Sequence, residues 1–390
     1  MSVPIATLRE AVTATHDRYL AELATLVNID CGSYTPAGVN LVADHATDAL
    51  AALGATVERI PHTPAVGEPQ LGDLVIGRLA GDGPRLMLIG HMDTVFEAGT
   101  AAERPFRVEG GRALGPGVTD MKAGLLAGLH ALRGLLASGA RPSVTFVSNP
   151  DEEIGSPFST PIIRSLVADH DVALVLECAR ANGDIVSARK GIADAEVLVR
   201  GRAAHAGIEP EKGRHAILAA ARQVERIQAL NGRWSTVTAN VGVIGGGTRP
   251  NVVPAECRYQ VDLRAATVAE FDAAWAELGA IVAEPAPDGT AAELRRIAHH
   301  PPMEASPAGT RLVALAAGIA AELGFALRDA STGGASDANT TAAAGLPTLD
   351  GLGPVGGDDH SADEWLDLES VVPRVTMLAA LIDRVNEALA

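Results

Sequence analysis

Three short apolar runs in the first half of the chain each lead into histidine or carboxylate side chains. Near-continuous apolar runs of this length, separated by helical patterns, predict strands of a parallel or mixed sheet covered on both faces. The carboxyl ends of such strands meet at one edge of the sheet, so the side chains that follow them are expected to share a site. The runs are 85–90, 143–148 and 171–176, and the side chains that follow them are His91, Asp93, Glu152, Glu153 and Glu177.

A different pattern begins near Lys190. Stretches that alternate apolar and polar residues are interleaved with helical stretches, which predicts a small α+β, ferredoxin-like sandwich of about 110 residues. The α/β pattern returns after about Thr310. The sequence therefore predicts a discontinuous α/β domain over 1–189 and 302–390, with a second domain inserted at 190–301.

The composition excludes several classes of partner. A net charge of −17 makes nucleic acid and anionic lipid poor partners. Three scattered cysteines do not form a disulfide framework and favour a reducing compartment. The chain shows no secretion signal and no run approaching the roughly 18 apolar residues of a membrane span. We therefore expect a soluble, cytoplasmic protein that binds neither nucleic acid nor membrane.

Two further residues extend the group of candidate metal ligands. Asp120 is predicted to start a helix over 120–139, and His360 lies near the end of a Gly-rich loop, 351–361. Imidazole combined with carboxylate favours zinc over a metal that prefers thiolates. Two imidazoles with three or more carboxylates exceed the needs of one catalytic zinc, but suit two metals roughly 3.5–4 Å apart that share a carboxylate.

Each of these residues has an ordinary structural interpretation when taken alone. A histidine after a strand is more often structural than a ligand, Asp93 is typical of a turn, and Asp120 could be a helix N-cap. The adjacent Glu152 and Glu153 could form a solvated acidic turn. The metal interpretation is favoured because all of them are expected at one edge of the same sheet.

Four segments carry a resemblance to a known family. They resemble metallopeptidases of the glutamate carboxypeptidase (carboxypeptidase G) type, whose wider family includes aminoacylases, acetylornithine deacetylase and succinyl-diaminopimelate desuccinylase. The resemblance runs in order along nearly the whole chain and implies a zinc-peptidase α/β domain with a mixed sheet. The segments are 91–95, 117–122, 151–155 and 356–361.

The resemblance implies a role for each of the candidate residues in the α/β domain. His91 and Glu177 would bind one zinc, Glu153 and His360 would bind a second, and Asp120 would bridge the two. Asp93 would orient the His91 imidazole. Glu152 would be the general base and then the acid that protonates the leaving amine.

The resemblance also implies that the inserted domain is a lid through which two chains form a homodimer. His205, in segment 204–207, would reach the partner's active site and stabilise the oxyanion. Asn251 and Arg264 would hold a substrate carboxylate, for which the planar fork of arginine is suited. Arg264 alone would otherwise be interpreted as an edge-strand ion pair. Gly334 would help to shape the substrate pocket.

The expected activity is hydrolysis of an amide bond next to a free carboxylate, with two Zn²⁺ per chain. The substrate would be a small N-acyl amino acid or peptide, and the released C-terminal residue could be glutamate. Cobalt or manganese could replace zinc. An N-acyl amino acid deacylase or a dipeptidase would use the same residues, and a non-catalytic dimeric binding protein is a further alternative, against which the intact Glu152 argues.

Cys178, which follows Glu177 where some relatives have proline, is expected to be a buried thiol.

Overall fold

The computed structural model describes residues 2–285 and 289–389, and its chain divides into two compact units. The first unit comprises Met1–Ser187, Ala305–Ser331 and Ser336–Ala390. The second comprises Ala188–Glu304 and Thr332–Ala335. Part of the predicted insertion, residues 286–288, lies outside the described residues.

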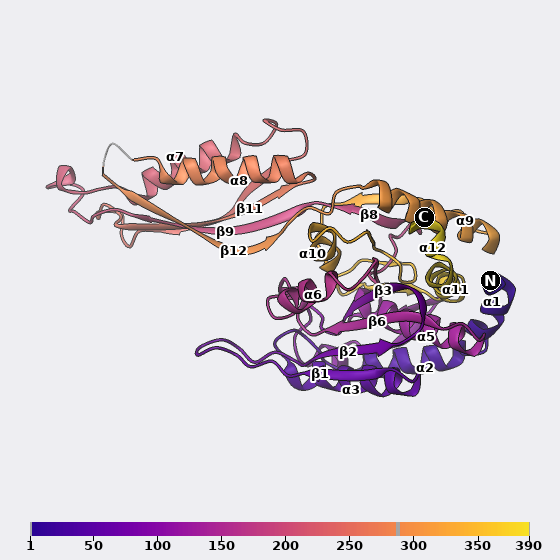
Figure 1. Ribbon diagram of the computed structural model, residues 1–390. Helices are drawn as coiled ribbons and strands as arrows, with labels where there is room; N and C mark the ends of the chain where they lie inside the picture. Colours follow the sequence, from indigo (N-terminus) through magenta and orange to yellow (C-terminus); the bar gives the residue numbers. More distant parts are fainter. Residues whose placement is uncertain (1, 286–288, 390) are drawn as a thin grey trace. The chain divides into compact units, whose positions relative to one another are not determined.

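The first unit is built on a six-stranded mixed sheet (Figure 1). The strand pairs β3–β6, β3–β7 and β7–β14 are parallel, whereas β1–β2 and β2–β6 are antiparallel. Strand β3 is buried from Leu86 to His91, as expected of a strand with parallel neighbours on both sides. In sheet order the strands are β1 (Thr56–Ile60), β2 (Leu74–Leu79), β6 (Pro142–Asn149), β3 (Asp82–His91), β7 (Val172–Val175) and β14 (Thr348–Leu349).

Helices cover this sheet and share one large apolar core with it. Helix α5 packs against β3 and α11, and α10 packs against β7 and α6. The α helices of the unit are α1 (Ile5–Thr13), α2 (His16–Val27), α3 (Pro36–Ala52), α4 (Thr100–Glu103), α5 (Gly124–Ala137), α6 (Ser159–Val167), α9 (Pro307–Leu323), α10 (Asp337–Ala343), α11 (Leu368–Arg384) and α12 (Asn386–Leu389).

A second, smaller sheet in the first unit joins segments that are distant in sequence. Its strand order is β15–β16–β5–β4, and Leu114 at the end of β5 pairs with Trp365 in β16. The strands are β15 (Gly356–Gly357), β16 (Trp365–Asp367), β5 (Arg112–Leu114) and β4 (Arg107–Glu109). A two-stranded sheet of β8 (Ile185–Arg189) and β13 (Asp329–Thr332) lies where the chain passes between the units.

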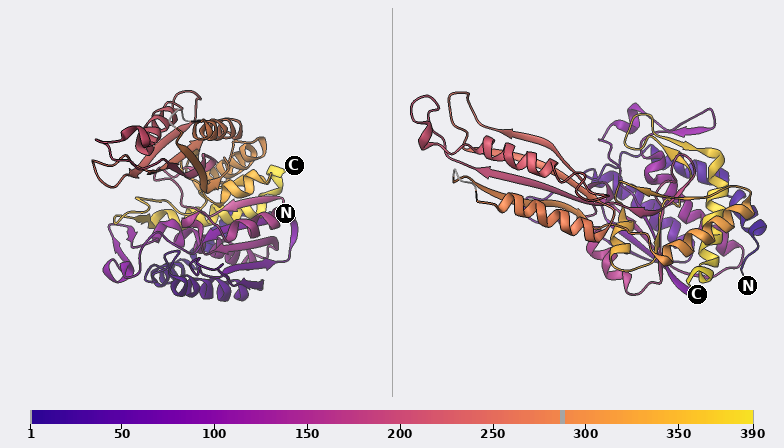
Figure 2. Two further views of the ribbon diagram at one scale, coloured as in Figure 1. Left: turned by 90° about the vertical axis from the view of Figure 1, so that its left-hand side faces the viewer. Right: turned by 90° about the horizontal axis from the view of Figure 1, so that it is seen from above.

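The second unit has the predicted ferredoxin-like topology. Its four antiparallel strands follow the order β10–β11–β9–β12, and α7 and α8 pack on one face of the sheet (Figures 1 and 2). Alternate β11 residues, such as Tyr259 and Val261, are buried in the core that the helices share. The elements are β9 (Gly191–Arg200), α7 (Ala216–Gln228), β10 (Thr238–Gly246), β11 (Glu256–Ala265), α8 (Val268–Ala283) and β12 (Ala291–His300).

One predicted helix boundary is wrong. Helix α5 begins at Gly124, and Asp120 lies before it in an irregular turn, Val118–Ala123, with φ −109° and ψ 97°. The backbone N–H groups of this segment donate to the Glu364 carboxylate instead of starting a helix. Asp120 is therefore placed by a loop and not by a helix terminus.

No helix within residues 2–285 and 289–389 combines the length and the apolar character needed to cross a membrane.

Candidate metal centre

The five predicted ligands and Glu152 come from five separate segments of the first unit. His91 is the last residue of β3, and Glu177 follows β7 by two residues. Glu152 and Glu153 lie in a short 3₁₀ turn, Glu152–Ile154, after β6. Asp120 and His360 are contributed by the loop after β5 and by the loop between β15 and β16.

Asp120 lies between two imidazoles. Its Oδ1 is 3.1 Å from Nε2 of His91, and its Oδ2 is 3.1 Å from Nε2 of His360. Two atoms that each lie about 2.0–2.1 Å from a tetrahedral ion are about 3.3 Å apart. Each oxygen of Asp120 is therefore at a distance from one imidazole that suits ligands of a common ion.

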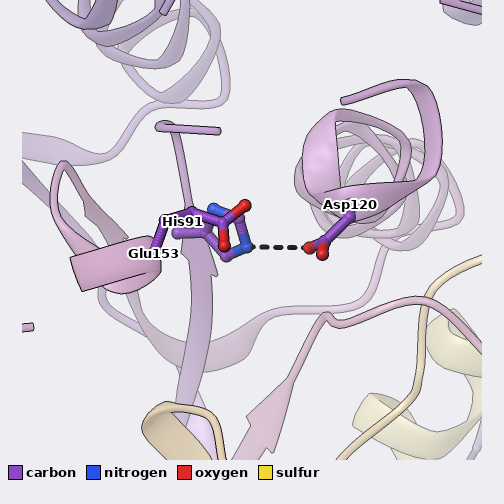
Figure 3. Close-up of side chains that lie close together, drawn as sticks. All are labelled: His91, Asp120 and Glu153. Atoms are coloured by element: carbon purple, nitrogen blue, oxygen red, sulfur yellow. Dashed lines mark hydrogen bonds and ion pairs between the residues drawn. The ribbon is translucent and has the colours of Figure 1, made fainter. Parts of the chain in front are cut away.

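Two further carboxylates, Glu177 and Glu153, each lie beside one of the two imidazoles that Asp120 contacts. Glu177 Oε1 lies 3.8 Å from His91 Nε2, and Glu153 Oε2 lies 3.1 Å from His360 Nε2. Figure 3 shows Asp120 directed toward His91. Ligand atoms of His91, Asp120 and Glu153 fall within 4.8 Å of one another, as do those of His91, Glu152 and Glu177.

The chemistry of this donor set fits a pair of divalent cations. Glu153 Oε1 is buried and has no hydrogen-bond partner among the residues that the structure describes. Burial, followed by repulsion from neighbouring carboxylates, raises the pKa of Glu152 well above its usual range, and burial also raises the pKa of Glu153. Added positive charge would offset both effects, so the site is suited to metal cations.

Protons would compete with a bound metal for the ring nitrogens of His91 and His360. Hydrogen bonds to Asp120 and Glu153 raise the pKa of His360 to about 11. Burial alone would lower the pKa of His91, but contacts with Asp120, Asp93 and Glu177 raise it well above its ordinary value. Because a metal binds only neutral imidazole, metal binding at this site would release protons.

Asp93 supports both His91 and the turn that carries the glutamates. Its backbone oxygen is 3.0 Å from Nδ1 of His91. Its buried carboxylate accepts hydrogen bonds from the backbone N–H groups of Glu152 and Glu153, both at 3.1 Å, and from the Ser33 hydroxyl at 2.6 Å. The contact with the glutamate turn and the role of Ser33 were not predicted from the sequence.

The second unit brings His205 and Asn251 together. His205 forms a β-bridge with Val252, and the Ala206 N–H donates to the Asn251 carbonyl at 3.0 Å. His205 is exposed, and its Nδ1 accepts a hydrogen bond from the Gly207 N–H at 3.2 Å. A neutral ring in this arrangement carries its proton on Nε2, which is then available as a donor.

Arg264 lies at the opposite end of β11 from this pair. It donates from Nε to Asp262 Oδ1 at 2.9 Å and from Nη2 to Oδ2 at 2.8 Å, and its Nη1 donates to the Gly333 carbonyl. Gly334, next to Gly333, accepts a hydrogen bond from Arg189. The ion pair expected of Arg264 is present, but β11 lies between β10 and β9 and is not the edge strand that this interpretation assumed. Substrate binding by Arg264 and Gly334 stays a prediction.

Cys178 is buried beside the metal centre. Its Sγ lies 3.7 Å from Asp359 Oδ2, and burial, followed by repulsion from Asp359, raises the pKa of the thiol well above its usual range. Cys178 is thus a buried thiol, as expected from the sequence.

The chain is similar to several known proteins. A model described as "Peptidase family M20/M25/M40" matches residues 87–384. Carboxypeptidase G2 from Pseudomonas sp. (strain RS-16) is 32% identical over 381 residues, which cover 96% of this chain and 91% of that protein. Acetylornithine deacetylase from Myxococcus xanthus is 31% identical over 257 residues, which cover 63% of this chain and 66% of that protein.

Solved structures share the fold at lower identity. Aminopeptidase PepT from Bacillus cereus superposes with a TM-score of 0.78 at 24% identity, over 95% of this chain and 99% of that chain. An M20 family metallo-carboxypeptidase from Sulfolobus solfataricus gives a TM-score of 0.73 at 15% identity, over 94% and 98% of the two chains. At these identities the likeness establishes the fold alone.

Proposed function

This chain belongs to peptidase family M20/M25/M40 and is a hydrolytic enzyme, and we propose that it uses two zinc ions to cleave an amide bond next to a free carboxylate. The observation that carries the proposal is the position of Asp120, whose two carboxylate oxygens each lie 3.1 Å from a different imidazole. One ion would be held by His91, Asp120 and Glu177, and the other by Asp120, Glu153 and His360. When bound, the two ions would polarise the substrate carbonyl and make a water molecule more acidic.

Glu152 is the proposed general base. It is adjacent to Glu153, and it lies close enough to His91 and Glu177 to face the same space. The Glu152 carboxylate would take a proton from the attacking water and then deliver it to the leaving amine. Positive charge at the site would counter the burial that raises its pKa, which favours the ionised form that a base requires.

His205 and Asn251 are proposed to act in the active site of a partner chain. His205 pairs with Val252, just before β11 begins at Glu256, and Arg264 lies eight positions further along that strand, which corresponds to about 26 Å at the usual strand rise. Two residues of extended substrate span only about 7 Å. If Arg264 and His205 contact the same substrate, they therefore come from different chains. This argument supports a homodimer formed through the second unit.

Within that arrangement each residue has a distinct task. Arg264 would hold the substrate carboxylate, with its Asp262 partner fixing the plane of the guanidinium. His205 Nε2 would donate to the oxygen that becomes negative during attack, and Asn251 would assist in binding. Gly334 would leave room for the substrate beside Arg264.

A cytoplasmic location is proposed from the composition.

The proposal also concerns which amino acid the enzyme releases. The 32% identity to a carboxypeptidase G2 favours a carboxypeptidase that acts on an N-acyl or peptidyl substrate, with glutamate as the first candidate to test. The similarity to an acetylornithine deacetylase keeps an N-acyl amino acid deacylase as the second candidate. Both reactions use the same residues, so only a substrate panel separates them.

The test is metal analysis paired with hydrolysis assays. Protein purified without chelator is expected to contain about two zinc per chain. A panel of N-acetyl amino acids, dipeptides and an aroyl-glutamate should show hydrolysis that chelator abolishes and zinc restores. Glu152→Gln should keep both metals and lose turnover. Absence of metal and of zinc-restored turnover would refute the proposal, and turnover in Glu152→Gln would refute the assignment of the base.

A further inference from the structure

We infer that Glu364 is the positioning residue for Asp120, and that it controls how tightly the proposed metal centre holds zinc. The inference rests on the proposed function and adds to it a residue that does not touch the metals. Glu364 is 1% exposed and lies four residues after His360 in the sequence. Its two oxygens accept three backbone hydrogen bonds, all from the segment that ends at Asp120.

The three donors span the loop that carries Asp120. The N–H of Gly117 donates to Oε2 at 2.8 Å. The N–H groups of Thr119 and Asp120 donate to Oε1 at 2.8 and 3.0 Å. These groups are in an irregular segment and have no helical partner, so without Glu364 they would be buried and unsatisfied. The carboxylate therefore determines the path of the backbone at Asp120.

Glu364 pairs with the backbone of Asp120 and leaves its side chain free. Both oxygens of the Asp120 carboxylate remain directed at the imidazoles of His91 and His360. A bridging carboxylate must present two oxygens to two ions at once, so a small rotation of its backbone would weaken both bonds. Outer contacts of this kind typically change metal affinity by about 10–100-fold.

The loop that carries Glu364 also carries His360, one of the two imidazoles that Asp120 contacts. Residues 358–364 connect β15 to β16, and they carry His360 as well as Glu364. Trp365 donates from Nε1 to Asp358 Oδ2 at 2.9 Å, which closes this loop on itself. Strand β16 pairs with β5, which leads directly into the Asp120 segment. One hairpin thus fixes His360 relative to Asp120.

Close packing prevents the hairpin from moving away. A Cβ on Gly356 would lie 1.9 Å from Thr119 Oγ1, so only glycine allows β15 to approach the Asp120 segment this closely. On the other side, the buried Lys122 donates from Nζ to the carbonyls of Pro116 and Ile29. The Glu364 carboxylate thus accepts from the N–H groups of the segment, and Lys122 donates to its Pro116 carbonyl and links it to Ile29.

The test compares zinc affinity in Glu364→Gln, Glu364→Ala and a matched control, Asp363→Asn. Gln retains the shape of Glu but offers one acceptor oxygen, so at least one N–H loses its partner. Asp363 is exposed, lies in the same loop, and gives the same change of charge. Zinc binding is measured by competition with a chromophoric chelator, and the visible spectrum of cobalt-loaded protein reports the ligand geometry directly.

Glu364→Gln is expected to bind zinc at least about tenfold more weakly, with an altered cobalt spectrum and a lower kcat at similar KM. Asp363→Asn should match the parent protein in all of these. If Glu364→Ala does not fold, Glu364→Gln alone decides the question. Parent-like zinc affinity and cobalt spectrum in Glu364→Gln would overturn the inference while leaving the proposed function intact. A parent protein that binds no zinc would overturn both.

Discussion

Nδ1 of His91 lies 3.0 Å from the backbone carbonyl oxygen of Asp93, two residues further along the chain. This contact requires the proton of a neutral ring on Nδ1 and leaves Nε2 unprotonated toward Asp120. The Asp93 carboxylate also lies near this ring, with Oδ1 3.4 Å from Nδ1, and it accepts hydrogen bonds from the backbone N–H groups of Glu152 and Glu153. A single residue thereby contacts one proposed ligand mainly through its backbone carbonyl and holds another, together with the proposed base, through its side chain.

Replacement of Asp93 by Ala should separate these two effects. The carbonyl 3.0 Å from His91 Nδ1 remains and this ring loses only the longer, 3.4 Å contact with the carboxylate, whereas the N–H groups of Glu152 and Glu153 lose their acceptor. We expect kcat to fall by more than about tenfold, and the metal held by Glu153 and His360 to be lost before the metal held by His91. Metal equivalents per chain at increasing chelator concentration, together with kcat, check this. Asp82→Ala, an exposed position at the start of β3, is the control. Equal loss of both metals would contradict the prediction.

Mixing two inactive variants should restore activity. Glu152→Gln removes the base, and His205→Ala removes the proposed donor to the partner's site. A mixed dimer would contain one site with both residues intact, so random exchange of chains should restore about a quarter of the parent activity. The measurement is turnover after the two proteins are unfolded and refolded together, compared with each refolded alone. If the mixture stays inactive while mixed dimers form, His205 does not act across the dimer.

Loss of Arg374 should destabilise the loop that leads to His360. This buried arginine on α11 donates to the carbonyls of Gly353 at 3.0 Å, Gly183 at 3.1 Å and Gly351 at 2.6 Å. Arg374→Met would leave these oxygens without that donor, and we expect the free energy of unfolding to fall by about 3 kcal/mol. Chemical denaturation measures this, with Arg9→Met on the exposed surface as the control. A change no greater than that of the control would show that the contacts contribute little.

The pH dependence of stability should include a contribution from Glu22. Burial would raise the pKa of this carboxyl, but hydrogen bonds with His130 and Arg18 lower it to about 2 from an ordinary value of 4.5. A carboxyl whose pKa is lower in the folded state stabilises the protein above about pH 4.5, and the contribution is lost as the pH falls toward 2. The loss in stability caused by Glu22→Gln should therefore be larger at pH 6 than at pH 3.

Denaturation of metal-free protein at the two pH values tests this, because acid also displaces metals. Glu10→Gln, on the exposed side of α1, serves as the control. If Glu22→Gln costs the same stability at both pH values, the hydrogen bonds with His130 and Arg18 do not lower the pKa of Glu22.

The sheet was predictable because its strands are buried on both sides. The runs 85–90, 143–148 and 171–176 correspond to β3, β6 and β7, and their apolar character reflects parallel neighbours and covering helices. The ferredoxin-like unit was predictable for a related reason. Its strand β11 alternates buried and exposed residues because helices cover only one face.

The site was harder to predict where it depends on contacts that are distant in sequence. Asp120 was expected at a helix start, because its sequence context contains no sign that Glu364, 244 residues away, would take up its N–H group. A single glutamate in a polar loop has no periodicity that distinguishes it from a solvated residue. The separation of His205 from Arg264 likewise depends on strand register, which local patterns do not determine.

The 240 residues that separate Asp120 from His360 also have a consequence for biosynthesis. At about 5–20 residues per second, a ribosome needs roughly 10–50 s to add the second imidazole after the bridging aspartate. During that time the nascent chain has only part of the ligand set, and the hairpin that fixes Asp120 does not yet exist. Binding of the proposed metals would therefore be a late step, and the ions would be taken from the pool that the nearly finished protein encounters.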